Sequence, residues 1–228
     1  MADKKKQEAL KKKINQVLVV CACVFFVILM ILSGMSSHWL SIFTVVKPGD
    51  RVVVDYTFFD ANGNPVLTDD LQSYTQLAQA GKSVVFGKNI SVIAGQNGVK
   101  LVYPVPIFIP NSGWTEQFGV FENEYNAIGA AVTGMKSGDH KRISITNGSI
   151  VQQWQRDKVG KALNWDALNI GDALTMAVSD MPQENITDTN ATTYVRIGVI
   201  TAKTNDSMLV DSGYPAADIS ISAINPSS

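Results

Sequence analysis

The clearest alternation of apolar and polar residues runs from Arg51 to Phe59. Four apolar side chains occupy every second position of this stretch: Val52, Val54, Tyr56 and Phe58. That spacing is typical of a strand with one buried face. The following segment, Asp60 to Asn64, contains a glycine able to adopt a positive φ, and an apolar stretch resumes at Pro65. The pattern therefore predicts a strand, a tight turn and a returning strand.

A second pattern has helical spacing. Four apolar residues recur three or four positions apart: Tyr125, Ile128, Val132 and Met135. This spacing places them on one face of a helix, and Gly134 can end that helix in the left-handed conformation. Residues 138–139 then predict a turn, and residues 142–145 alternate like a half-buried strand.

The rest of the chain after residue 40 reads as further strands and loops. Residues 151–168 predict a polar, partly helical connector. Strands are expected at residues 169–178, 194–202 and 208–211, forming a small β unit, and at residues 218–224. Residues 71–121 form a long connection with a helix near residues 76–80. Its prolines predict an edge strand at residues 99–109. Aromatic side chains of this connection either form a binding surface or cover a core: Tyr103, Phe108, Trp114, Phe118 and Phe121.

Near the N-terminus, residues 17–35 are almost continuously apolar, and no charge occurs between Lys13 and Lys47. About 19 apolar residues are enough to cross a bilayer as a helix, which predicts a transmembrane helix at residues 14–36. A cleaved signal peptide is the alternative, although its apolar core is normally shorter. Lysines before the run place the N-terminus in the cytoplasm, so the rest of the chain is expected outside it.

Charge and composition narrow the function. Residues 1–13 hold six lysines against two acidic residues, which leaves 13 basic and 18 acidic residues in the remaining chain. An acidic body without a basic patch argues against a nucleic-acid partner. Both cysteines lie in the apolar run, so the sequence predicts no disulfide framework and no thiolate metal site. His38 and His140 are isolated, and we expect no metal and no cofactor.

Five Asn-x-Ser/Thr sequons lie after the apolar run, most of them near predicted turns. They are candidate glycosylation sites on the outer side of the membrane: Asn89, Asn147, Asn185, Asn190 and Asn205.

Two stretches resemble the FKBP family of peptidyl-prolyl isomerases and folding helpers. They are VKPGDRVVVDYTFFDANGNPV, at residues 46–66, and GMKSGDHKRISI, at residues 134–145. Residues 170–174 and 208–217 resemble the SlyD-like subgroup, including its archaeal version, in which a small insert-in-flap β domain interrupts the FKBP domain. The resemblance implies an α+β fold, with an FKBP-like antiparallel sheet wrapped on a short helix. It also implies an inserted small β domain, in addition to the N-terminal transmembrane helix.

The expected domain organisation follows the chain in order. It comprises a cytoplasmic basic tail at 1–13, a transmembrane helix at 14–36, a linker at 37–45, an FKBP-like domain at 46–150 with an insertion at about 71–121, an insert-in-flap-like domain at 151–213, and a closing strand at 214–228.

The resemblance also implies where a prolyl-peptide pocket would lie. The matching positions are Tyr56, Val66, Leu67, Tyr125 and Ile128, of which Tyr56 alone carries the family's residue. Prolyl isomerisation needs a dry aromatic pocket rather than a nucleophile or a metal. Two functions remain open. The first is a membrane-anchored, extracytoplasmic isomerase and chaperone with a degenerate pocket, acting on unfolded or proline-containing polypeptides. The second is a non-catalytic FKBP-like accessory subunit of a membrane or cell-surface protein complex. In both, the lipid bilayer is contacted through residues 14–36.

Overall fold

The structure is a computed structural model that describes residues 18–21, 23–27, 30, 44–159, 163–180 and 192–226. The chain divides into two compact units, Met1–Phe43 and Thr44–Ser228. The strands and helices named below all belong to the second unit.

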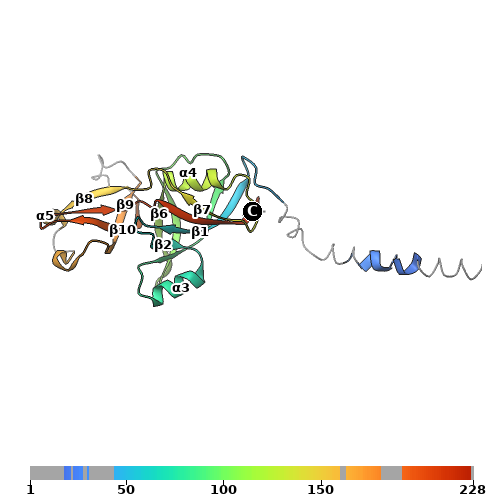
Figure 1. Ribbon diagram of the computed structural model, residues 1–228, viewed down its shortest axis with the longest axis horizontal. Helices are drawn as coiled ribbons and strands as arrows, with labels where there is room; N and C mark the ends of the chain where they lie inside the picture. Colours follow the sequence, from blue (N-terminus) through green and yellow to red (C-terminus); the bar gives the residue numbers. More distant parts are fainter. Residues whose placement is uncertain are drawn as a thin grey trace, which may run out of the picture. The chain divides into compact units, whose positions relative to one another are not determined.

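A mixed β-sheet of twelve strands dominates this unit (Figure 1). Its strands are β1 (Arg51–Phe59), β2 (Pro65–Thr68), β3 (Val85–Gly87), β4 (Ile90–Ile93), β5 (Val102–Ile109), β6 (Gly113–Phe121), β7 (His140–Ser144), β8 (Val151–Gln155), β9 (Ala173–Ser179), β10 (Thr193–Lys203), β11 (Ser207–Asp211) and β12 (Ala216–Ile224). The order along the sheet is β7-β12-β1-β2-β3-β5-β6-β10-β11-β8, while β4 pairs with β1 and β9 with β10. The helical elements are α3 (Leu71–Gln79), α4 (Glu122–Ala131), α5 (Arg156–Val159) and a 3₁₀ turn at Trp165–Ala167.

The alternating segment near the start of the unit forms β1, with the bounds and the buried face that its pattern predicts. Its four alternate apolar side chains are buried: Val52, Val54, Tyr56 and Phe58. The turn after β1 is organised by Asp60, whose carboxylate accepts hydrogen bonds from the backbone N–H groups of Asn62 and Asn64. Gly63 has a φ of +77° there, a conformation that a side chain would disfavour. The predicted strand-turn-strand unit is therefore confirmed.

The helix-turn-strand unit is also confirmed, although α4 begins three residues before the predicted apolar face. Glu124 explains this early start, because its carboxylate accepts a hydrogen bond from the Phe121 N–H at the N-terminus of α4. Gly134 has a φ of +84° after the helix, and β7 follows the turn at Gly138.

Two clusters of buried apolar side chains form the core of the unit. The larger cluster lies between α4 and the strands around β1, and it includes Tyr56, Phe118 and Ile128. The smaller cluster joins β9, β10 and β11 around Trp165 and Met208. The strands predicted for a separate insert domain thus contribute their own apolar cluster within the same sheet.

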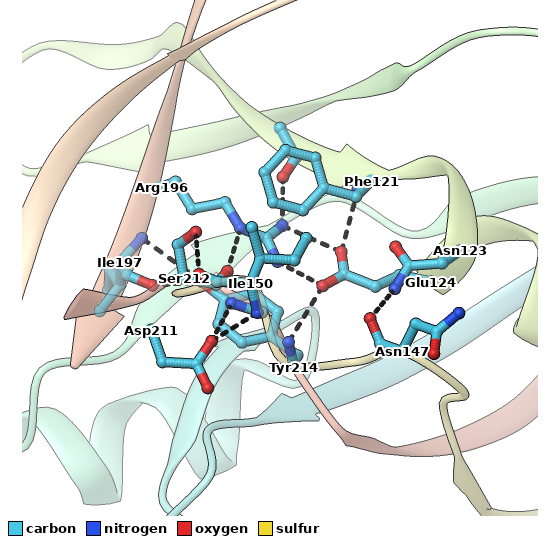
Figure 2. Close-up of polar contacts among 12 residues, drawn as sticks. Phe121, Asn123, Glu124, Asn147, Ile150, Arg196, Ile197, Asp211, Ser212 and Tyr214 are labelled. Carbon is cyan, nitrogen blue, oxygen red and sulfur yellow. Dashed lines mark hydrogen bonds and ion pairs between the residues drawn. The ribbon is translucent and has the colours of Figure 1, made fainter. Parts of the chain in front are cut away.

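Arg196 occupies the middle of the core, and its side chain has no exposed surface (Figure 2). Its guanidinium forms an ion pair with Glu124, which is equally buried. The Arg196 Nε donates to the Ser212 carbonyl at 2.7 Å, and one terminal nitrogen donates to the Gly119 carbonyl at 2.5 Å. Arg196 therefore links α4, β6, β10 and the segment after β11 through hydrogen bonds.

Aromatic rings cover both faces of this guanidinium. The Arg196 Cζ lies 3.9 Å from the ring centroid of Phe121 and 4.0 Å from that of Tyr214. The Tyr214 N–H donates to Glu124 at 3.2 Å, and its hydroxyl donates to the Ile197 carbonyl at 2.9 Å. A buried charge is tolerated only when it is paired and hydrogen-bonded, and both conditions are met here.

The predicted FKBP-like fold class is wrong. The strands form one twelve-stranded mixed sheet, with parallel pairing of β2 with β3 and of β10 with β6, rather than an antiparallel sheet interrupted by a separate β domain. The long connection contributes β3, β4, β5 and β6 to this sheet. The stretch expected as an edge strand is β5, which pairs with both β3 and β6. Its prolines are tolerated because β3 pairs only with Ile107 and Phe108, beyond Pro104 and Pro106.

The prediction of a transmembrane helix is not borne out by the described residues either. Much of the span at 14–36 lies outside the described residues, as do the basic tail at 1–13 and most of the linker. Among the residues that the structure does describe, no helix has the length and apolar character needed to cross a membrane.

Candidate functional site

The pocket positions implied by the FKBP resemblance lie mostly in the core. Tyr56 is 3% exposed, Val66 is 2% exposed, and Leu67 and Ile128 are fully covered. The Tyr56 hydroxyl donates a hydrogen bond of 2.9 Å to the Lys88 carbonyl. Burial, together with the charge of Asp69, raises the pKa of this phenol well above its ordinary value. These four residues meet as packed core, and their role in binding a prolyl peptide stays a prediction.

Tyr125 has a different environment on α4. Its ring stacks on Tyr103 of β5, with centroids 3.8 Å apart and planes 5° apart. Its hydroxyl donates to the Ser91 carbonyl at 3.1 Å. Partial burial raises the pKa of Tyr125. The stacking fixes α4 against β5, so Tyr125 serves packing in this structure.

The sequons lie at turns wherever the structure describes them. Asn89, Asn147 and Asn205 are exposed, between β3 and β4, after β7, and between β10 and β11. Asn185 and Asn190 lie outside the described residues. Glycosylation of these positions stays a prediction.

Four aromatic side chains from four different elements form a contiguous, partly exposed group. We call this group the aromatic surface: Tyr74 of α3, Phe86 of β3, Phe108 of β5 and Trp114 of β6. Neighbouring ring centroids are 5.5 Å apart for Tyr74 and Phe86, 5.6 Å for Phe86 and Trp114, and 5.7 Å for Phe108 and Trp114. Trp114 is 43% exposed and Phe108 is 37% exposed. The Lys88 Nζ lies 5.1 Å from the centroid of the Trp114 ring.

Local sequence explains how the aromatic surface forms. Asp70 caps α3 by accepting hydrogen bonds from the N–H groups of Gln72 and Ser73, which places Tyr74 in the first turn. The hydrogen bond from the Ser73 side chain, with those backbone bonds, lowers the pKa of Asp70.

The strands contribute the other three rings. Phe86 and Phe108 are direct partners in the pairing of β3 with β5. The β5–β6 register shifts between Ile107 and Ile109, a bulge that redirects side chains at the position of Phe108. Gly113, at a φ of +78°, is the first residue of β6 after the turn from β5, and it directly precedes Trp114.

A polar groove of about 690 Å³ lies over the outer face of β1, β12 and β7. Four aspartates and three basic side chains line it: Asp55, Asp69, Asp70, Asp218, His140, Lys141 and Arg142. Partial burial is the largest cause that raises the pKa of Asp69, to about 7, and the nearby carboxylate of Asp55 adds to it. Asp69 is therefore a carboxyl group that exchanges a proton near neutral pH.

The described part of the chain contains no candidate metal-binding site. Within residues 44–159, 163–180 and 192–226, no three His, Cys, Asp or Glu side chains are arranged to hold a metal ion.

Sequence reasoning found half of the aromatic surface. Phe108 and Trp114 were among the aromatic residues of the long connection, whereas Phe118 is fully buried and Phe121 covers Arg196. Tyr74 and Phe86 were missed. Phe86 lies in a short apolar stretch before Gly87, a signal for a strand, but its position beside Phe108 depends on long-range pairing.

Neither the protein-family models nor the curated proteins contain a match to this chain.

Proposed function

We propose that this protein is a non-catalytic, polypeptide-binding accessory subunit of a larger protein assembly. The observation that carries the proposal is the aromatic surface, because Trp114 and Phe108 remain about two-fifths exposed although they pack against other rings. Contiguous exposed apolar patches on a protein surface mark interaction sites, whereas apolar residues exposed singly do not.

The chemistry of the aromatic surface suits a polypeptide partner. Trp and Tyr supply large contact areas with few rotatable bonds, so little conformational entropy is lost when they bind. Such residues dominate the binding energy of protein interfaces. Lys88 adds a positive charge beside Trp114 that can orient a partner's carbonyl or carboxylate groups. The expected ligand is a polypeptide segment that presents apolar side chains.

The positions that would form an isomerase pocket favour binding over catalysis. Tyr56, Leu67 and Ile128 are buried, and the Tyr56 hydroxyl is already engaged with the Lys88 carbonyl. Lowering the barrier of about 18–20 kcal/mol for amide rotation requires the substrate amide to enter a dry pocket. The burial of these side chains therefore supports the non-catalytic hypothesis.

A prolyl-isomerase assay on the 228-residue chain tests the non-catalytic part of the proposal. A chromogenic tetrapeptide with a central proline is the probe, and the expected rate equals the uncatalysed rate. Acceleration that depends on protein concentration, and that Tyr56→Phe reduces, would overturn this part and restore the isomerase hypothesis.

Binding of a panel of fluorescently labelled 12-residue peptides tests the proposal that the protein binds polypeptides. Peptides rich in Leu, Phe and Trp should bind, and otherwise identical peptides with Ser at those positions should not. Trp114→Ala should weaken binding about tenfold or more, the range of an interface hot spot. Val151→Ala is the matched control, because Val151 is 51% exposed on β8, outside the aromatic surface. Equal weakening by both variants would remove the aromatic surface as the binding site.

A further inference from the structure

A groove of about 600 Å³ is lined by residues of α4 and β7. These two elements are in contact, and both are labelled in Figure 1. We call it the α4–β7 groove. On the helix side its lining consists of small side chains and two amides: Ala127, Ala130, Ala131, Asn123 and Asn126. Because alanine side chains are small, they leave room beside β7 for a neighbouring chain.

The outer edge of β7 is open within the described part of the chain. β7 is the last strand at one end of the sheet and pairs there only with β12. The Ile145 N–H donates to the Pro215 carbonyl, and the Ile221 N–H donates to the Asp139 carbonyl. Hydrogen-bonded pairs alternate in an antiparallel ladder, so the odd-numbered residues of β7 face β12. The backbone N–H and C=O groups of His140, Arg142 and Ser144 therefore point away from the sheet, toward the open edge.

The charge of the groove is of one sign. Lys141 and Arg142 are the charged residues in its lining, and both are exposed. The Arg142 guanidinium lies 3.7 Å from the Asp218 carboxylate, with the two side chains 59% and 49% exposed. Exposed ion pairs of this kind contribute little. The Arg142 guanidinium also lies 4.3 Å from the centroid of the Phe59 ring, so Lys141 is the better-placed positive charge for a partner in the groove.

We propose that the α4–β7 groove binds an acidic polypeptide segment in extended conformation, as an additional strand beside β7. Main-chain hydrogen bonds at a sheet edge supply affinity, and alternate side chains supply specificity. A five-residue strand such as β7 spans about 17 Å, which a partner segment of five or six residues covers. Lys141 shares its face of β7 with the buried Ile143, because successive side chains of a strand alternate, so acidic residues on that face of the added segment would lie beside Lys141.

Charge also distinguishes this occupant from a second copy of the chain. Antiparallel pairing of two β7 strands would bring the basic residues of one copy opposite those of the other. Like charges directly opposite each other destabilise a strand pair. An acidic segment removes this repulsion, whereas basic and self-pairing segments retain it.

Backbone hydrogen exchange on the full chain tests the proposal with a defined probe. The probe is a seven-residue peptide of alternating Glu and Val. Its binding should slow exchange at the Arg142 and Ser144 amides, which face the open edge, more than at other amides. A peptide of alternating Lys and Val should give no protection. N-methylation of alternate amides in the acidic probe should abolish protection, because strand pairing needs those N–H groups.

Three variants test whether the acidic probe binds at the α4–β7 groove or at another surface. Lys141→Glu should weaken binding of the acidic probe about five- to tenfold, since one attraction becomes a repulsion. Lys158→Glu on α5 is the matched control and should leave binding unchanged. Trp114→Ala should also leave it unchanged, which keeps this inference independent of the proposed function. Protection that centres on the aromatic surface, equal binding of the basic peptide, or self-association of the chain through β7 would each overturn the proposal.

Discussion

Two groups of aromatic side chains in the described part of the chain differ in whether the chain closes over them. Around Arg196, Phe121 and Tyr214 enclose a guanidinium that is fully buried and paired with Glu124. On the aromatic surface, Trp114 lies beside Lys88 in a similar cation–π contact but remains 43% exposed.

The comparison shows that aromatic side chains beside a cation can stabilise the fold or offer a binding surface, depending on their exposure. Buried rings around a satisfied ion pair hold elements together, and removing a partner leaves a charge without compensation. Exposed rings have unfilled contact area that a partner can cover. Variants of the buried cluster should therefore change stability, and variants of the aromatic surface should change binding.

The largest expected effect is on Glu124. Glu124→Ala leaves the buried Arg196 charge unpaired and should lower the free energy of unfolding by about 3–5 kcal/mol. Urea denaturation followed by circular dichroism measures this change. Glu122→Ala, in the same first turn of α4, is the matched control, with an expected loss below about 1 kcal/mol.

A double variant examines the origin of that loss. Glu124→Leu combined with Arg196→Met replaces the ion pair by apolar groups and should be less destabilising than Glu124→Ala alone. A double variant as unstable as the single one would show that the ion pair itself, rather than the unpaired charge, holds the core.

Tyr214→Phe has the next largest expected effect. The change removes the hydroxyl that donates to the Ile197 carbonyl at 2.9 Å and keeps the ring over Arg196. The expected loss is about 1 kcal/mol in the free energy of unfolding. A loss as large as that for Glu124→Ala would mean that the hydroxyl, and not the ion pair, is the main contact of the buried cluster.

Asp69 should have a smaller effect on stability than Glu124, and this effect should depend on pH. Asp69 is a partly buried carboxyl group that lies beside another carboxylate, whereas Glu124 is paired with an arginine. Its pKa is raised to about 7 in the folded protein, mainly by burial, against about 3.9 in an unfolded chain. Between these values the folded state binds more protons than the unfolded state. The contribution of Asp69 to the free energy of unfolding is therefore fully present below about pH 4, and it is lost as the pH rises through about 7.

Urea denaturation at a series of pH values between 4 and 8 measures this dependence. Asp69→Asn should flatten the fall in stability, because the asparagine does not titrate. His140→Asn replaces another side chain that lines the same groove; it is the control and should retain the fall. If Asp69→Asn left the slope unchanged, another group would be responsible.

Regular patterns predicted individual elements, although the predicted fold class was wrong. The alternation in β1 and the helical spacing in α4 each reported a buried face, and both elements formed where expected. β3 has three residues and β8 has no fully buried side chain, so neither produced a clear pattern. The single sheet was not predictable, because the parallel pairing of β10 with β6 joins strands far apart in the sequence.

The two aromatic clusters illustrate what sequence cannot provide. Arg196 interrupts a nearly continuous apolar strand, which signals a partner, but its partner Glu124 is 72 residues away. Likewise, Tyr74 and Trp114 lie on different elements and come together around Phe86 only through the sheet. Local periodicity reports which face of an element is buried, whereas sites assembled from several elements depend on the tertiary pairing.

The smallest expected change in stability belongs to the aromatic surface itself. Phe108→Ala removes a ring that is already 37% exposed, so the free energy of unfolding should fall by less than about 1 kcal/mol. Thermal and urea denaturation measure it. A loss above about 3 kcal/mol, the range of a fully buried phenylalanine, would place Phe108 with the core instead.

The dissociation constant of the best-binding apolar peptide, measured for the wild-type chain and for Trp114→Ala, tests the central claim most directly. The account predicts that Trp114→Ala raises this constant about tenfold or more, while the free energy of unfolding changes by less than about 1 kcal/mol. An unchanged dissociation constant, or a loss of binding that only accompanies unfolding, would contradict the assignment of the aromatic surface to polypeptide binding.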